Sequence, residues 1–89
     1  MEKKYTDVII DDKTRYRIFN EDVDDRELLW HQDKKDRTVR VLGGKDWHIQ
    51  FDNELPTVLE EGKEYKISNH TFHRVIKGKG DLVVKITEK

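Results

Sequence analysis

The feature that most constrains the fold is the alternation of apolar and polar residues in short runs. In RTVRVL (residues 37–42), the two valines fall on one face and polar residues on the other. This period of two is that of a half-buried strand, and helical periodicity is almost absent from the chain. About eight or nine such runs follow one another at close intervals, with turn residues between them. The pattern therefore predicts an all-β sandwich or closed barrel.

The runs also predict where the strands lie. Strands are expected over residues 5–10, 14–19, 37–42 and 47–52, with another that begins at Glu27 and includes His31. Two short strands are expected around Gly62, within residues 57–68, and residues 73–77 and 82–89 are expected to pair as a hairpin.

Turn residues separate these strands. The acidic residues 20–26 predict a loop, and Gly43-Gly44 before Lys45-Asp46 predicts a tight reversal. Pro56 ends the strand over residues 47–52, because proline has no N–H to donate to a ladder.

Length and composition narrow the function classes. The 89 residues form one expected domain, residues 1–89, in which strands and the acidic loop fill residues 1–26. A core this small would gain from pairing, so a homodimer is expected. The 18 Lys and Arg nearly balance the 19 Asp and Glu, which argues against the basic stripe of a nucleic-acid-binding protein.

Two absences in the sequence bear on cellular context. The chain has no cysteine, which excludes disulfides and thiolate metal sites. No apolar run approaches the roughly 20 residues that span a bilayer. We therefore expect a soluble cytoplasmic protein whose partner is a small molecule, with neither a membrane nor a nucleic acid.

Three residues form a candidate metal site. His31 and Asp33 are two apart and share one face of an extended segment, and His73 follows on a later strand. Two imidazoles and one carboxylate suit Fe(II), Mn(II), Ni(II) or Zn(II), and three ligands leave positions open. The alternative is that His31 and Asp33 belong to a charged strand edge, with His73 a buried, hydrogen-bonded histidine.

Arg37 carries a second question. If the alternation holds, Arg37 shares the inward face of Val39 and Val41 and needs a partner there. That partner is either Asp33 or a bound carboxylate or phosphate. Alternatively, a bulge in DKKDR turns Arg37 outward and brings Asp36 toward the metal.

A polar face on the strand over residues 47–52 offers further candidates. His48 and Gln50 would contact a ligand if this strand lines the mouth of the barrel. They would face solvent if Trp47, Ile49 and Phe51 fill the bottom of the core.

Residues 62–73 resemble the second motif of the cupin family. Gly62, Ser68, His70 and His73 stand at the spacing of that motif, in which Ser68 replaces the usual proline and His70 the usual glycine. His70 is accordingly expected in a surface loop. Gly62 and His73 match the motif, and His73 stands at the position of a metal ligand.

The first cupin motif is similar but altered. His31, Asp33, Arg37 and Gly44 stand where the family has two histidines, an acidic residue and a glycine. Asp33 thus replaces the second histidine and Arg37 replaces the acidic ligand. The resemblance covers residues 27–86 and implies a double-stranded β-helix barrel, often dimeric, with a site inside its mouth.

Three functions remain open at this stage. The first is a metal-dependent enzyme acting on a small molecule, since H-x-D…H resembles the ligand set of non-haem iron oxygenases. The second is a non-catalytic module that holds a nucleotide, sugar phosphate or carboxylate through Arg37, His31 and His73. The third is a structural barrel whose edge strand forms a symmetric dimer.

Overall fold

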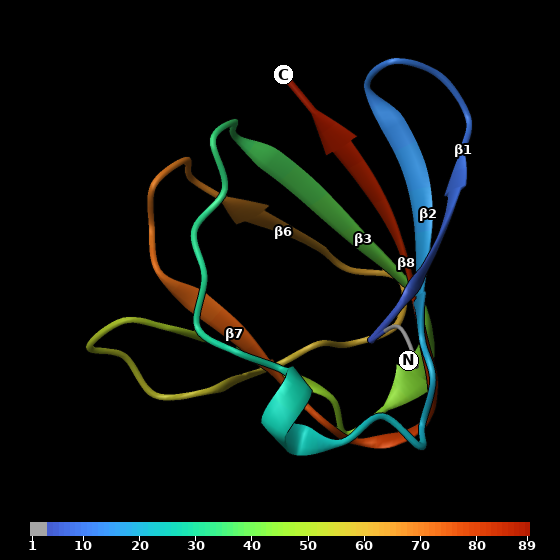
Figure 1. Cartoon of the computed structure of the whole chain (residues 1–89), viewed down its shortest axis with the longest axis vertical. Helices are drawn as coiled ribbons and strands as arrows, with labels where there is room; N and C mark the ends of the chain where they lie inside the picture. Colours follow the sequence, from blue (N-terminus) through green and yellow to red (C-terminus); the bar gives the residue numbers. More distant parts are fainter. Residues whose placement is uncertain (1–3) are drawn as a thin grey trace.

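The computed structural model describes residues 4–89, which form eight strands and one short 3-10 helix (Figure 1). The elements are β1 (Thr6–Ile9), β2 (Thr14–Phe19), η1 (Asp25–Glu27), β3 (Arg37–Lys45), β4 (His48–Phe51), β5 (Thr57–Val58), β6 (Glu64–Ile67), β7 (His73–Ile76) and β8 (Lys79–Glu88). The prediction of an all-β chain is confirmed. Among the described residues, no helix has the length and apolar character needed to cross a membrane.

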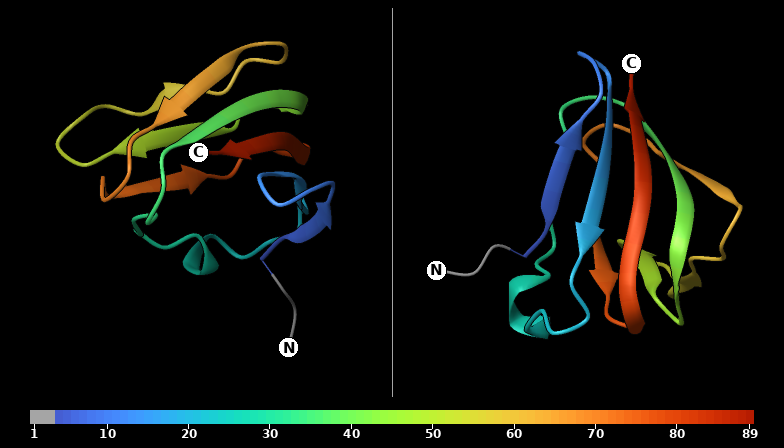
Figure 2. Two further views of the ribbon diagram at one scale, coloured as in Figure 1. Left: turned by 90° about the horizontal axis from the view of Figure 1, so that it is seen from above. Right: turned by 90° about the vertical axis from the view of Figure 1, so that its right-hand side faces the viewer.

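The strands form two antiparallel sheets that face each other. The five-stranded sheet has the order β1-β2-β8-β3-β6, and the three-stranded sheet has the order β5-β4-β7. Figure 2 shows the two layers. The segment between β2 and β3 leaves the five-stranded sheet, bridges through His31 to His73 of the three-stranded sheet, and returns in β3. The arrangement is that of a jelly-roll barrel, in which side chains from the two inner faces share one core.

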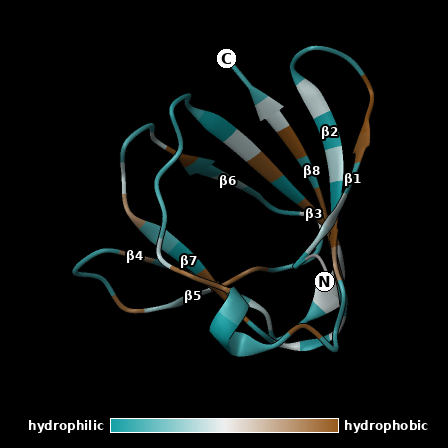
Figure 3. Cartoon of the chain, viewed as in Figure 1, coloured by the Kyte–Doolittle hydropathy of each residue, from teal (hydrophilic) through white to brown (hydrophobic). Residues whose placement is uncertain are grey.

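The core follows the predicted alternation. Val39 and Val41 of β3 lie opposite Ile86 and Val84 of β8, and all four are buried. Figure 3 shows the resulting hydrophobic and hydrophilic bands along β3 and β8. Trp47 is fully buried, and its indole N–H donates to the Gly80 carbonyl at 3.0 Å. This bond satisfies the one polar atom that burial of the ring would otherwise leave unpaired.

The predicted hairpin of the last two strands is wrong. β7 pairs with β4, whereas β8 pairs with β2 and β3 in the other sheet. Gly78 lies at this change of sheet, and a Cβ there would be 2.2 Å from the Lys45 carbonyl oxygen. Only glycine allows the two chain crossings to pass this closely.

Two local predictions are also wrong. Glu27 to His31 is not a strand: Asp24 caps the short helix η1, and only His31 pairs, as an isolated bridge to His73. Gly43-Gly44 does not reverse the chain, because β3 continues to Lys45 through two register shifts. The reversal comes at Asp46, which has a φ of 60°.

Candidate functional site

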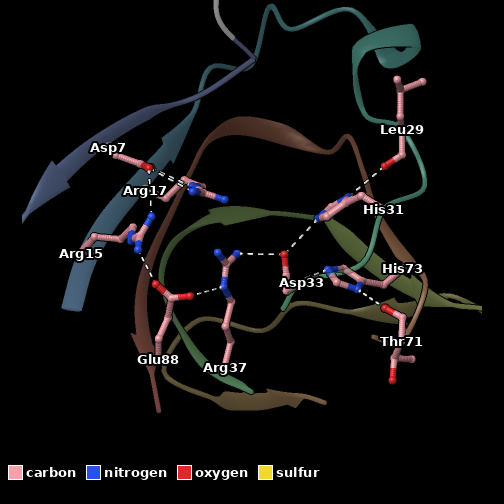
Figure 4. A network of polar contacts seen from close by, with 10 residues as sticks. All are labelled: Asp7, Arg15, Arg17, Leu29, His31, Asp33, Arg37, Thr71, His73 and Glu88. Atoms are coloured by element: carbon pink, nitrogen blue, oxygen red, sulfur yellow. Dashed lines mark hydrogen bonds and ion pairs between the residues drawn. The ribbon is translucent and has the colours of Figure 1, made fainter. Parts of the chain in front are cut away.

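A cavity of about 160 Å³ lies between the two sheets. Most of its wall is apolar and comes from both sheets. Its apolar lining includes Phe19, Leu28, Val39, Ile49, Leu82 and Ile86. The polar side chains gather at one end, and Figure 4 shows them close up.

His31, Asp33 and His73 meet at this polar end. One potential ligand atom from each lies within 4.8 Å of the other two. His73 begins β7, and His31 lies beside it because the two backbones exchange a pair of hydrogen bonds, each 2.9 Å long. The structure therefore brings together the three residues that were predicted as metal ligands.

Both imidazole rings are oriented by their own backbone. Nδ1 of His31 lies 3.0 Å from the Leu29 carbonyl, and Nδ1 of His73 lies 2.8 Å from the Thr71 carbonyl. A carbonyl accepts only from N–H, so each neutral ring carries its proton on Nδ1 and a lone pair on Nε2. Fixing the tautomer from the far side of the ring is how proteins prepare histidines for a metal.

The two Nε2 atoms point toward the Asp33 carboxylate. Nε2 of His31 is 3.9 Å from Oδ1, and Nε2 of His73 is 3.4 Å from Oδ2. Burial, the largest influence, lowers the pKa of His73, which favours the neutral ring.

Oδ2 of Asp33 is buried and has no hydrogen-bond partner among the described residues. A buried carboxylate oxygen facing a lone pair is costly unless a cation lies between them. The donor set therefore fits a divalent metal.

The Asp33 backbone is held by the turn before β7. The His70 N–H donates to the Asp33 carbonyl at 2.7 Å, and His70 has a φ of 60°. This left-handed conformation explains why the cupin motif favours glycine there. His70 itself is exposed in the loop, as predicted.

Arg37 rather than Asp36 faces the cavity. Its Nη1 lies 3.3 Å from Oδ1 of Asp33, and its Nε lies 3.3 Å from Oε2 of Glu88. β3 keeps its alternation from Arg37 through Val41, so no bulge turns this side chain outward. Asp36 is exposed, and its carboxylate accepts from the Asn69 N–H at 2.8 Å.

His48 and Gln50, predicted as ligand-binding residues if their strand lines the barrel mouth, are not among the residues that line the cavity. Trp47 and Ile49 fill the core, and this places their neighbours on the outer face of β4. Gln50 instead donates to the Glu54 carbonyl at 3.0 Å and accepts from Arg74 at 3.0 Å.

Sequence reasoning missed Arg17, whose side chain lines the cavity. It is 8% exposed, donates to both carboxylate oxygens of Asp7 at 2.7 and 2.9 Å, and lies 3.7 Å above the ring centroid of Tyr5. Arg17 and Phe19 are the buried residues of β2, whereas Tyr16 and Ile18 are half-buried. The signal was Asp7, which lies directly across from Arg17 in the register of β1 and β2.

The charged side chains form one connected network. Arg15 contacts both Asp7 and Glu88, and Glu88 contacts Arg37, which contacts Asp33 (Figure 4). The hydrogen bond from Arg17, the largest influence, lowers the pKa of Asp7. The network holds the arginine side chains in fixed positions at the cavity wall.

Comparison with known proteins supports the fold. No protein-family model and no curated protein matches the chain. A DMSP lyase chain from the structures of RdDddP and RnDddQII superimposes with a TM-score of 0.72 at 13% identity, over 85% of this chain and 37% of that one. A cupin-2 domain protein from Shewanella frigidimarina gives 0.68 at 15% identity, over 96% and 79%. HppE in its Fe(II) form gives 0.67 at 16% identity, over 85% and 41%.

The chain thus spans less than half the length of the DMSP lyase and HppE chains that it resembles. The fold and the position of the polar group define a jelly-roll barrel with a candidate site in its mouth. The chain has the fold of small cupin-domain proteins, which is the fold that the resemblance of its two motifs implied.

Proposed function

We propose that this cupin binds one divalent transition metal through His31, Asp33 and His73 and acts on a small molecule in the cavity. The observation that carries the proposal is the orphaned Oδ2 of Asp33, which faces the Nε2 lone pair of His73. The chemistry of the donors suits Fe(II), Mn(II), Ni(II) or Zn(II). The likeness to HppE in its Fe(II) form supports the same class of site.

The chain's own residues would prepare the site. The Leu29 and Thr71 carbonyls hold the two rings, and the His70 N–H holds the Asp33 backbone. A metal bound by three side chains would offer Lewis-acid chemistry at its open positions. The apolar wall would exclude water from a small molecule bound there.

Arg37 favours a second candidate function. It stands where cupins carry an acidic ligand and already neutralises Oδ1 of Asp33 at 3.3 Å, which weakens the attraction for a cation. In this second function the barrel holds an anion without metal and performs no chemistry.

Metal content distinguishes the two candidates. Protein purified without chelators or nickel resin, then incubated with each of the four metals, is analysed by elemental mass spectrometry and isothermal titration calorimetry. We expect about one equivalent of metal, as for a three-ligand site. Binding should be lost in Asp33→Asn and His73→Ala, with the fold checked by circular dichroism.

His48→Ala is the matched control. The His48 ring has the same type of contact to its own backbone, with Nδ1 3.0 Å from the Asp46 carbonyl, but it lies outside the cavity. This variant should retain its metal. Failure of the wild-type protein to bind any of the four metals would reject the metal site.

A further inference from the structure

We propose that Arg17 and Arg37 form a carboxylate subsite beside the metal site, and that the ligand is a small acid with an aliphatic body. The inference rests on the proposed function in one respect: the end of the acid that reacts would lie at the metal. The subsite itself consists of side chains of this chain and is testable without metal.

Arg17 is fixed in the cavity wall, and one nitrogen of its guanidinium group has no hydrogen-bond partner among the described residues. Asp7 accepts from Nε and Nη2, and the Tyr5 ring lies 3.7 Å below the guanidinium. Within residues 4–89, Nη1 has no hydrogen-bond partner. An arginine that is 8% exposed and fixed on two sides has lost its rotamer freedom already, so binding a ligand costs little further ordering.

Arg37 shows the same pattern from the neighbouring part of the sheet. Glu88 accepts from Nε, Nη1 faces Asp33, and Nη2 has no hydrogen-bond partner in the described part of the chain. Figure 4 shows the terminal nitrogens of Arg17 and Arg37 directed toward the same space, into which His31 and Asp33 also point. Both arginines line the one cavity.

The charges around this space favour an anion. Lys4, Arg17 and Arg37 line the cavity, and within residues 4–89 Asp33 is the one carboxylate that lines it. Asp7 and Glu88 bind the outer parts of the arginines and do not line the cavity. With Asp33 committed to a metal, cationic groups dominate the polar end, and an anionic ligand would offset them.

The shape and the rest of the wall narrow the ligand class. The cavity of about 160 Å³ is small for a ligand pocket, which favours a short acid over a larger anion such as a nucleotide. The two free arginine nitrogens supply one donor for each oxygen of a carboxylate, whereas a phosphate group has further oxygens to satisfy. Beyond the polar end, Phe19, Val39 and Ile86 offer only apolar contact. A short aliphatic carboxylate would bind the arginines through its charged group and the apolar wall through its hydrocarbon chain.

The test is an NMR titration that observes the side-chain Nε–Hε signals of the arginines. Butyrate is the probe, butanamide is its uncharged analogue, and inorganic phosphate is the competing anion. Each is added to metal-free protein and to protein loaded with diamagnetic Zn(II). We expect butyrate to shift the signals of Arg17 and Arg37, to leave Arg15 unchanged, and to bind more tightly than phosphate or butanamide.

Variants give a second readout. Arg17→Gln and Arg37→Gln should each weaken butyrate binding about tenfold or more, the loss expected for one charge-assisted contact. Arg15→Gln is the matched control, because Arg15 contacts Asp7 and Glu88 but does not line the cavity. It should change the affinity less than about twofold. If either glutamine variant unfolds, the wild-type Nε–Hε shifts still decide the question.

The outcomes separate the subsite from the metal site. Butyrate binding at Arg17 and Arg37 without any metal uptake would support the subsite and reject the proposed metal function. Metal uptake with no butyrate-induced shift at either arginine would support the metal site and reject the carboxylate subsite. Tighter binding of phosphate than of butyrate, or equal binding of butanamide, would overturn the assignment of the carboxylate class.

Discussion

The two faces of the three-stranded sheet carry similar residues but differ in how their polar groups are satisfied. On the outer face, Arg74 donates to Gln50 and lies 5.0 Å from the centre of the Trp30 ring. On the inner face, Asp33 beside His73 keeps one oxygen without a partner among the described residues. A polar group whose hydrogen bonds are all made within the protein needs no ligand, whereas a buried polar atom without a partner is stabilised by one. The difference locates the site on the inner face.

The largest expected effect is on stability, and it tests which face forms the core. Ile49→Ala removes a side chain that is 3% exposed and should lower the free energy of unfolding by about 2–5 kcal/mol. The adjacent Gln50→Ala should lower it by less than about 1 kcal/mol, because the outer face is open to water. Urea denaturation measures both. Equal losses would mean that the two faces are not distinct.

The next effect tests the incomplete polar group directly. Zn(II) at about a hundred times its dissociation constant should raise the stability of the wild-type protein by about 2.7 kcal/mol, through binding to the folded state. Asp33→Asn should abolish this gain, whereas Arg74→Gln on the outer face should retain it. Thermal denaturation with and without Zn(II) measures the shift. An equal gain in the Asp33→Asn variant would assign the zinc to another site.

The sequence predicted the fold class because the core enforces a period of two. The same period favoured an inward Arg37, but a bulge that brings Asp36 inward stayed open as the alternative. The sequence also predicted that His31, Asp33 and His73 come together, because the cupin motifs fix their order. It did not predict Arg17 at the cavity. Its cross-strand partner Asp7 makes burial of the charge tolerable, and that pairing depends on register rather than on local pattern. The change of sheet at Gly78 was missed for a related reason, since a short glycine-rich turn is common to hairpins and to crossings between sheets.

A smaller effect extends the comparison to the five-stranded sheet. Asp7→Asn should lower stability at neutral pH by about 1–3 kcal/mol, because Arg17 would lose its charged acceptor while remaining buried. Glu64→Gln breaks the exposed contact to Arg40 and should cost less than about 0.5 kcal/mol.

The stability of the Asp7→Asn variant should also depend on pH differently from that of the wild-type protein. The pKa of Asp7 is lowered in the folded state, so its contribution is present above the pKa of an unfolded aspartate and is lost as the pH falls toward the lowered value. Denaturant titrations across acid pH should show a shallower decline for Asp7→Asn than for the wild-type protein. Parallel curves would show that Asp7 is not linked to folding in this way.

The smallest effect concerns the turn that holds Asp33. The left-handed conformation of His70 costs a non-glycine residue about 1–2 kcal/mol, and glycine removes this strain. Glycine also loses more backbone entropy on folding, which offsets part of the gain in stability. His70→Gly should therefore stabilise the protein by about 0.5 kcal/mol. Because the backbone N–H that donates to Asp33 is kept, metal affinity should not change. His70→Ala keeps the strain and is the control. A loss of metal affinity in His70→Gly alone would mean that the rigidity of this turn, and not only its N–H, positions Asp33.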